Sequence, residues 1–87
     1  MDTESEAEAC FDVLKRNKPD ELGYNALVKK PGQSISSVGD EWAVFVSDQM
    51  NQTFASDESV WQEFADSIRQ EGYSVELNST GTSMTVW

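Results

Sequence analysis

The chain has one cysteine and no histidine among its 87 residues, so it lacks the disulfide bonds and Cys/His metal sites that often stabilise small domains. Cys10 alone cannot form an intramolecular disulfide bond, and a zinc site built from cysteine and histidine is excluded. No stretch has the spacing of an EF-hand calcium loop, and we expect no metal or cofactor. The fold must therefore rest on apolar packing or on a partner. The aromatic residues expected in the core are Trp42, Phe45, Phe54, Trp61, Phe64, Tyr73 and Trp87.

Two segments have apolar residues spaced three and four positions apart, the period of an amphipathic helix. The first runs from about residue 4 to 17, with Thr3 as its predicted N-cap and Glu6 completing a capping box. The second follows a predicted N-cap at Ser56 and ends before Gly72. The expected core faces contain Ala7, Cys10, Phe11 and Leu14 in the first helix, and Val60, Trp61, Phe64, Ala65 and Ile68 in the second.

Short apolar or alternating segments between turn residues predict the strands. They are residues 24–30, 33–38, 41–48, 73–78 and 83–87. Residues 41–48, EWAVFVSD, are nearly continuous in apolar residues, which is typical of a central, buried strand. The expected order is α-β-β-β-α-β-β. It predicts a single compact α+β domain over residues 1–87, with an antiparallel sheet of four to five strands and both helices on one face.

The net charge is −10, from 16 acidic and 6 basic residues. Residues 1–12 carry five acids and no base, and residues 34–87 carry nine acids and only Arg69. The other five bases lie between residues 15 and 30. A field of this sign repels nucleic acid and anionic membranes and attracts basic proteins. We therefore expect no direct binding to nucleic acid or to a membrane.

Acidic residues follow the polar faces of both predicted helices. Glu4, Glu8 and Asp12 lie four positions apart, and Glu58, Glu63 and Asp66 point away from the apolar face of the second helix. Like charges at this spacing repel by about 0.2–0.5 kcal/mol per pair, so stability alone does not favour them. Their spacing of about 5–6 Å is comparable to that of phosphates along a nucleic-acid strand. The alternative is a solvated surface that only keeps the protein soluble.

Nothing in the sequence indicates catalysis. No nucleophile elbow, P-loop or dinucleotide-binding glycine motif occurs, and the carboxylates are too numerous for any pair to stand out. The beginning of the chain, MDTESEAEA, is acidic and polar, unlike a secretory signal, and no segment has the length of a membrane span. We expect a protein that is not an enzyme and lies in the cytoplasm, of a host cell if a phage encodes it.

These features favour an inhibitor that docks on a basic, nucleic-acid-binding surface of another protein and displaces its phosphates. In size, acidity and lack of catalytic motifs, the chain resembles phage-encoded anti-defence proteins such as anti-CRISPRs and DNA mimics. No motif accompanies this resemblance, so it implies no particular functional residue. The candidate contact residues are the acids Glu4, Glu8, Asp12, Asp40, Glu41, Asp48, Asp57, Glu58, Glu63 and Asp66.

A second hypothesis assigns the function to the sheet. In it, the protein is a regulatory or immunity-type subunit that binds through a hydrophobic sheet edge, with the hairpin over residues 73–87 as the candidate edge. The sequence leaves open the identity of the partner and whether the protein is a monomer or a homodimer.

Overall fold

The computed structural model describes residues 1–20, 22–32, 40–48, 58–78 and 83–87 and confirms the α+β class. Two helices and four strands occur there, in the order α1 (Glu4–Asn17), β1 (Tyr24–Lys29), β2 (Ala43–Asp48), α2 (Glu58–Gln70), β3 (Val75–Leu77) and β4 (Ser83–Val86). The strand predicted over residues 33–38 lies outside the described residues. Strand β2 begins two residues later than predicted, because Glu41 and Trp42 precede the pairing with β1.

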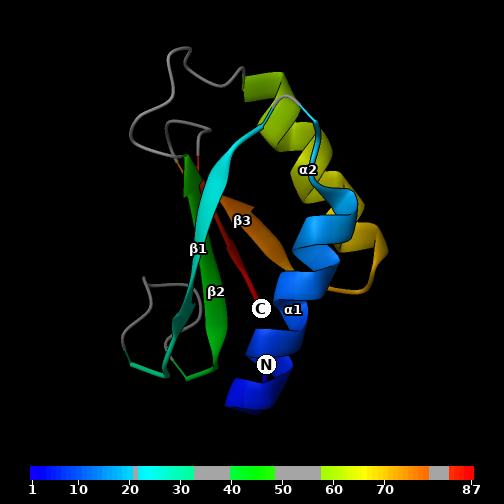
Figure 1. Ribbon diagram of the computed structural model, residues 1–87. Coiled ribbons are helices and arrows are strands. Elements are labelled where there is room, and N and C mark those ends of the chain that lie inside the picture. Colours follow the sequence, from blue (N-terminus) through cyan, green and yellow to red (C-terminus); the bar gives the residue numbers. More distant parts are fainter. Residues whose placement is uncertain (21, 33–39, 49–57, 79–82) are drawn as a thin grey trace.

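The four strands form one antiparallel sheet in the order β1-β2-β4-β3. Both helices lie on one face of this sheet, as predicted (Figure 1). Helix α1 packs against β1 and β2, and α2 packs against β3. Strands β1 and β3 are the outer strands of the sheet in the described part of the chain, and β2 lies inside it, as its apolar sequence predicts.

The ends of α1 follow from local sequence. The Glu6 N–H donates a hydrogen bond to Thr3 Oγ1 at 3.2 Å, which confirms Thr3 as the N-cap. The reciprocal half of the predicted capping box is wrong, since Glu6 Oε2 accepts from the Asp2 N–H at 3.3 Å rather than from Thr3. Lys18 leaves the helix with extended backbone angles because the ring of Pro19 disfavours a helical residue before it.

Helix α2 ends at the predicted glycine. Gly72 has a φ of +102°, a backbone conformation that residues with a Cβ atom rarely adopt. Its N–H donates to the Arg69 carbonyl at 3.0 Å, and the Tyr73 N–H donates to the Ile68 carbonyl at 3.4 Å. This pair of bonds is a Schellman motif, which satisfies the last carbonyls of the helix. The predicted N-cap Ser56 lies outside the described residues.

The core lies between the helices and the sheet. It includes Trp61, Phe64, Ile68 and Leu14, all fully buried. The Phe64 ring lies 5.6 Å from Tyr24 and 6.1 Å from Trp61, between ring centroids, so aromatic packing joins α2 to β1. Trp42 and Tyr73 are partly buried against this core.

Two aromatic residues expected in the core lie elsewhere. Phe45 stands between Val44 and Val46, whose side chains enter the core, so the alternation of a strand directs Phe45 to the opposite face. There Lys29 Nζ lies 6.0 Å from the centroid of the Phe45 ring. Trp87 is half-buried and is not among the residues of the core, and Phe54 lies outside the described residues.

Candidate protein-binding surface

The α1 acidic stripe consists of Glu4, Glu8 and Asp12, which are all exposed. The buried face of the same helix contains Ala7, Cys10 and Leu14. In the described part of the chain, no ion pair or hydrogen bond engages the three carboxylates.

Position along α1 distinguishes these three acids. Glu4 lies in the first turn, where the positive end of the helix dipole favours a carboxylate. Glu8 and Asp12 lie beyond that turn and repel each other across one turn of helix. Lys15 follows one turn later and is exposed, yet no ion pair between it and Asp12 forms among the described residues. Glu8 and Asp12 therefore have no stabilising role that their surroundings explain.

The acids of α2 are less uniform. Glu63 is exposed and has no ion pair in the described structure. Asp66 Oδ1 lies 3.0 Å from Arg69 Nη1, and Arg69 Nη2 donates to the Val75 carbonyl at 2.8 Å. Asp66 therefore helps to hold an arginine that bridges α2 and β3. Glu58 is the first residue of the helix, and its side chain is not described.

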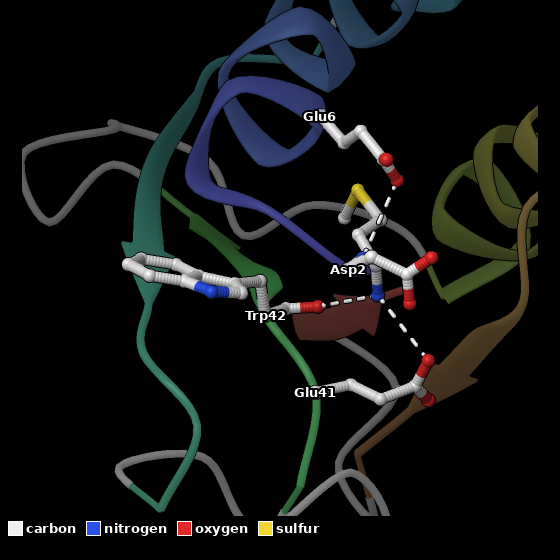
Figure 2. Close-up of polar contacts among 5 residues, drawn as sticks. Asp2, Glu6, Glu41 and Trp42 are labelled. Carbon is white, nitrogen blue, oxygen red and sulfur yellow. Dashed lines mark hydrogen bonds and ion pairs between the residues drawn. The ribbon is translucent and has the colours of Figure 1, made fainter.

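Glu41 contacts the beginning of the chain (Figure 2). The Met1 amine lies 3.4 Å from Glu41 Oε1 and donates to the Trp42 carbonyl at 2.8 Å, while the Trp42 N–H donates to the Met1 carbonyl at 3.0 Å. Met1 thereby pairs with Trp42, the residue before β2, just beyond the point where β4 ends. The neighbouring Asp40 is exposed and free of ion pairs in the described structure. Glu41 has a structural role, which makes it a weaker candidate for partner binding.

The predicted acids thus fall into three groups. Asp40, Glu63 and the α1 acidic stripe are exposed and unpaired among the described residues, whereas Glu41 and Asp66 make ion pairs within the chain. Asp57 lies outside the described residues, and side chains are not described for Asp48, which ends β2, or for Glu58, which begins α2.

Sequence reasoning missed Glu71. Its Oε2 accepts from Asn17 Nδ2 at 2.8 Å and lies 3.4 Å from Arg16 Nη2, so it ties the end of α1 to the end of α2. The hydrogen bond from Asn17, helped by the charge of Arg16, lowers the pKa of Glu71 despite an opposing effect of desolvation. No local signal predicts this contact, because its members lie more than 50 residues apart.

Three of the five basic residues between positions 15 and 30 make contacts within the chain. Arg16 pairs with Glu71, and Lys18 Nζ donates to the Leu22 carbonyl at 2.9 Å. Lys29 lies over the Phe45 ring. These cations are therefore committed locally and leave the α1 acidic stripe unneutralised.

The described residues contain no group of three or more side chains able to hold a metal ion, and none of their buried side-chain polar atoms lacks a hydrogen-bond partner. Burial raises the pKa of the Cys10 thiol to about 11, so the unreactive neutral thiol predominates near pH 7. No helix in this part of the chain is long and apolar enough to cross a membrane.

The edge formed by the hairpin is short. Its outer strand β3 has three residues, and Arg69 already occupies the Val75 carbonyl on it. Comparisons of the whole chain with protein families, with curated proteins and with solved structures find no match.

Proposed function

We propose that this protein is a non-enzymatic, acidic binding module that occludes a basic, nucleic-acid-binding surface of another protein. The observation that carries the proposal is the exposed pair Glu8 and Asp12 on α1, with no cation paired to either carboxylate in the described structure. A helix selected only for stability favours opposite charges at this spacing. Attraction to a basic partner would offset the repulsion between these two carboxylates.

The mechanism is competition for the phosphate sites of the partner. Helix α1 is 14 residues long and presents its acidic stripe along a rigid element, with a rise of about 6 Å between successive acids. A net charge of −10 steers a basic partner towards the protein and accelerates association. Once docked, the carboxylates take the places of phosphates and exclude the nucleic acid. A nucleic-acid-binding defence complex is one partner of this kind.

The alternative function, a regulatory or immunity-type subunit that binds through a sheet edge, predicts a different response to salt. A complex held by exposed charges weakens steeply as ionic strength rises, because ions screen the attraction over about 10 Å at 0.1 M salt. An edge-to-edge complex held by backbone hydrogen bonds and apolar contacts weakens little. The small size of β3 and the Arg69 contact on it favour the charge-driven function over binding at the hairpin.

The test is affinity capture with the full chain from a lysate of the cells in which it acts. Bound proteins are identified by mass spectrometry after elution with duplex DNA, and in parallel with salt or with an uncharged polymer. We expect a nucleic-acid-binding protein that DNA and salt release and that the uncharged polymer does not. Capture that resists both DNA and salt would contradict the proposal.

A further inference from the structure

The two outer strands of the sheet differ in how their free edges are protected. Strand β3 has three residues, and Arg69 donates to the Val75 carbonyl on it. Strand β1 has six residues, and no strand in the described part of the chain pairs with its outer edge. Natural sheets usually protect such edges with a charge, a proline, a bulge or a covering segment. The edge of β1 therefore requires an explanation.

Hydrogen bonds in the hairpin fix which backbone groups face which strand. Ser74 and Trp87 exchange two backbone hydrogen bonds, at 2.9 and 3.0 Å. The backbone N–H and C=O of Trp87 therefore point towards the β3 side. Successive residues of a strand point their N–H and C=O groups to opposite sides. The backbone groups of Val86 and Met84 therefore point towards β2. Their partners Val44 and Val46 face β4 in return. The one residue between these two valines, Phe45, consequently has its N–H and C=O groups directed towards β1.

The same alternation assigns the groups of β1. The backbone N–H and C=O of Phe45 point towards β1, where Leu27 is its partner. The N–H and C=O of Leu27 therefore point inward, towards β2. The backbone groups of Tyr24, Ala26 and Val28 then point out of the sheet, along the open edge. Three consecutive outward-facing donor and acceptor pairs make a complete template for one more antiparallel strand.

Nothing within the first five residues of β1 discourages such pairing. Residues 24–28 contain neither proline nor a charged side chain, and both are common protections of an edge. Leu27 is 57% exposed and is the single large hydrophobic residue classed as exposed in the described structure. It lies in the middle of the strand, on the face away from the helices.

Charge indicates which strand can bind there. Residues 22–39 contain no Asp or Glu, although the chain as a whole carries 16. Strand β1 is therefore a place where two copies of this acidic protein can approach with little local repulsion. Antiparallel pairing also brings the Lys29–Lys30 end of one strand towards the Asp20 end of the other.

We propose that β1 pairs with β1 of a second copy, antiparallel and around a two-fold axis at Leu27. In this register the outward N–H and C=O of Ala26 form hydrogen bonds with those of Val28 in the other copy. Leu27 lies beside Leu27 of the other copy. The sheet then continues across both protomers, and both α1 helices lie on the same face of it. The dimer would carry two α1 acidic stripes, but this inference does not depend on the proposed function.

The dimer has a salt dependence opposite to that of the proposed inhibitor complex. Each copy carries a charge of −10, so long-range repulsion opposes the dimer and salt relieves it. A single pair of edge strands buries little area, which is typical of weak and concentration-dependent association. Failure of one proposal is thus distinguishable from failure of the other.

The first test is sedimentation equilibrium of the full chain over a range of concentrations, at low and at high salt. We expect the average mass to rise from monomer towards dimer with concentration, and to rise further in high salt. Ala26→Pro removes an outward N–H on an edge strand, where proline is tolerated, and we expect this folded variant to stay monomeric. A wild-type protein that stays monomeric throughout would overturn the proposal, as would equal dimerisation of folded Ala26→Pro.

A second test detects the register. Leu27 lies in a non-hydrogen-bonded pair with its copy, where Cα atoms are about 4.5 Å apart, within the range for a disulfide bond. Leu27→Cys should therefore form a covalent dimer under mild oxidation. Glu76→Cys is the matched control, because it is exposed on the outer strand β3 and should not cross-link. Cys10 is buried and does not interfere. Equal cross-linking of the two variants would contradict the proposed pairing.

Discussion

The two helices cover one face of the same sheet, yet they differ in both their inner and their outer surfaces. Helix α2 buries Trp61, Phe64 and Ile68, whereas the fully buried residues of α1 are Ala7, Cys10 and Leu14. On the outer surface, Asp66 of α2 is paired with Arg69, while the α1 acidic stripe has no ion pair in the described structure.

This difference separates a helix that mainly holds the fold together from one that leaves its charges available. Large buried side chains contribute most of the apolar area removed from water, so α2 is expected to dominate the core energetically. Helix α1 contributes less to the core and carries a repulsive acidic pair, Glu8 and Asp12. In the proposed function, α1 is therefore the helix that would face the basic partner.

The largest expected effect is on the core of α2. Phe64→Ala removes a fully buried ring that contacts Tyr24 and Trp61, and should lower the free energy of unfolding by about 3–5 kcal/mol. Phe11→Ala on α1 is the matched control, because Phe11 is only partly buried and should cost clearly less. Urea titration followed by tryptophan fluorescence measures both. Equal losses would break the contrast between the helices.

A smaller effect is expected at the N-cap of α1. Thr3→Ala removes the acceptor of the Glu6 N–H and should lower the free energy of unfolding by about 1 kcal/mol. Thr3→Ser keeps the hydroxyl and should behave like the wild type. A loss near zero for Thr3→Ala would mean that packing against β1 and β2, rather than the cap, fixes the first turn.

The smallest effect is the pH dependence from Glu71, which joins the two helices. Its pKa is lowered in the folded protein, so its contribution to stability is present above the unfolded value of about 4.3 and is lost as pH falls through the folded value. The difference in unfolding free energy between wild type and Glu71→Gln should shrink towards acid pH. In an Asn17→Ala background this pH dependence should decrease, because the main cause of the lowered pKa is absent. An unchanged dependence would contradict the assigned cause.

Local sequence predicted what is locally determined. The bounds of α1, its N-cap and the Gly72 end of α2 follow from periodicity, capping and a positive φ, which involve residues a few positions apart. The interior position of β2 in the sheet also follows from its apolar sequence. The alternation of side chains along a strand directs Phe45 away from the core, whereas the continuous apolar run predicts burial on both faces.

The candidate surface was less predictable because its details depend on contacts between distant parts of the chain. The Met1 contact with Glu41, the Arg69 contact with Val75 and the Glu71 contact with Asn17 all depend on tertiary structure. Each assigns a charged residue to a structural role that composition cannot show. Tertiary contacts thus reduce the predicted acids to a smaller set that remains available to a partner.

We propose that Glu8 and Asp12 of the α1 acidic stripe serve binding and do not stabilise the fold. The most direct measurement compares Glu8→Gln/Asp12→Asn with Asp20→Asn/Glu76→Gln, which changes the net charge equally at other exposed positions. For each variant, affinity for the captured basic partner and the free energy of unfolding are measured at low salt. We expect the α1 variant to lose at least about tenfold in affinity, while its stability is unchanged or rises by about 0.2–0.5 kcal/mol, and we expect the control to keep its affinity. Equal affinities of the two variants, or a clear loss of stability in the α1 variant, would contradict this proposal.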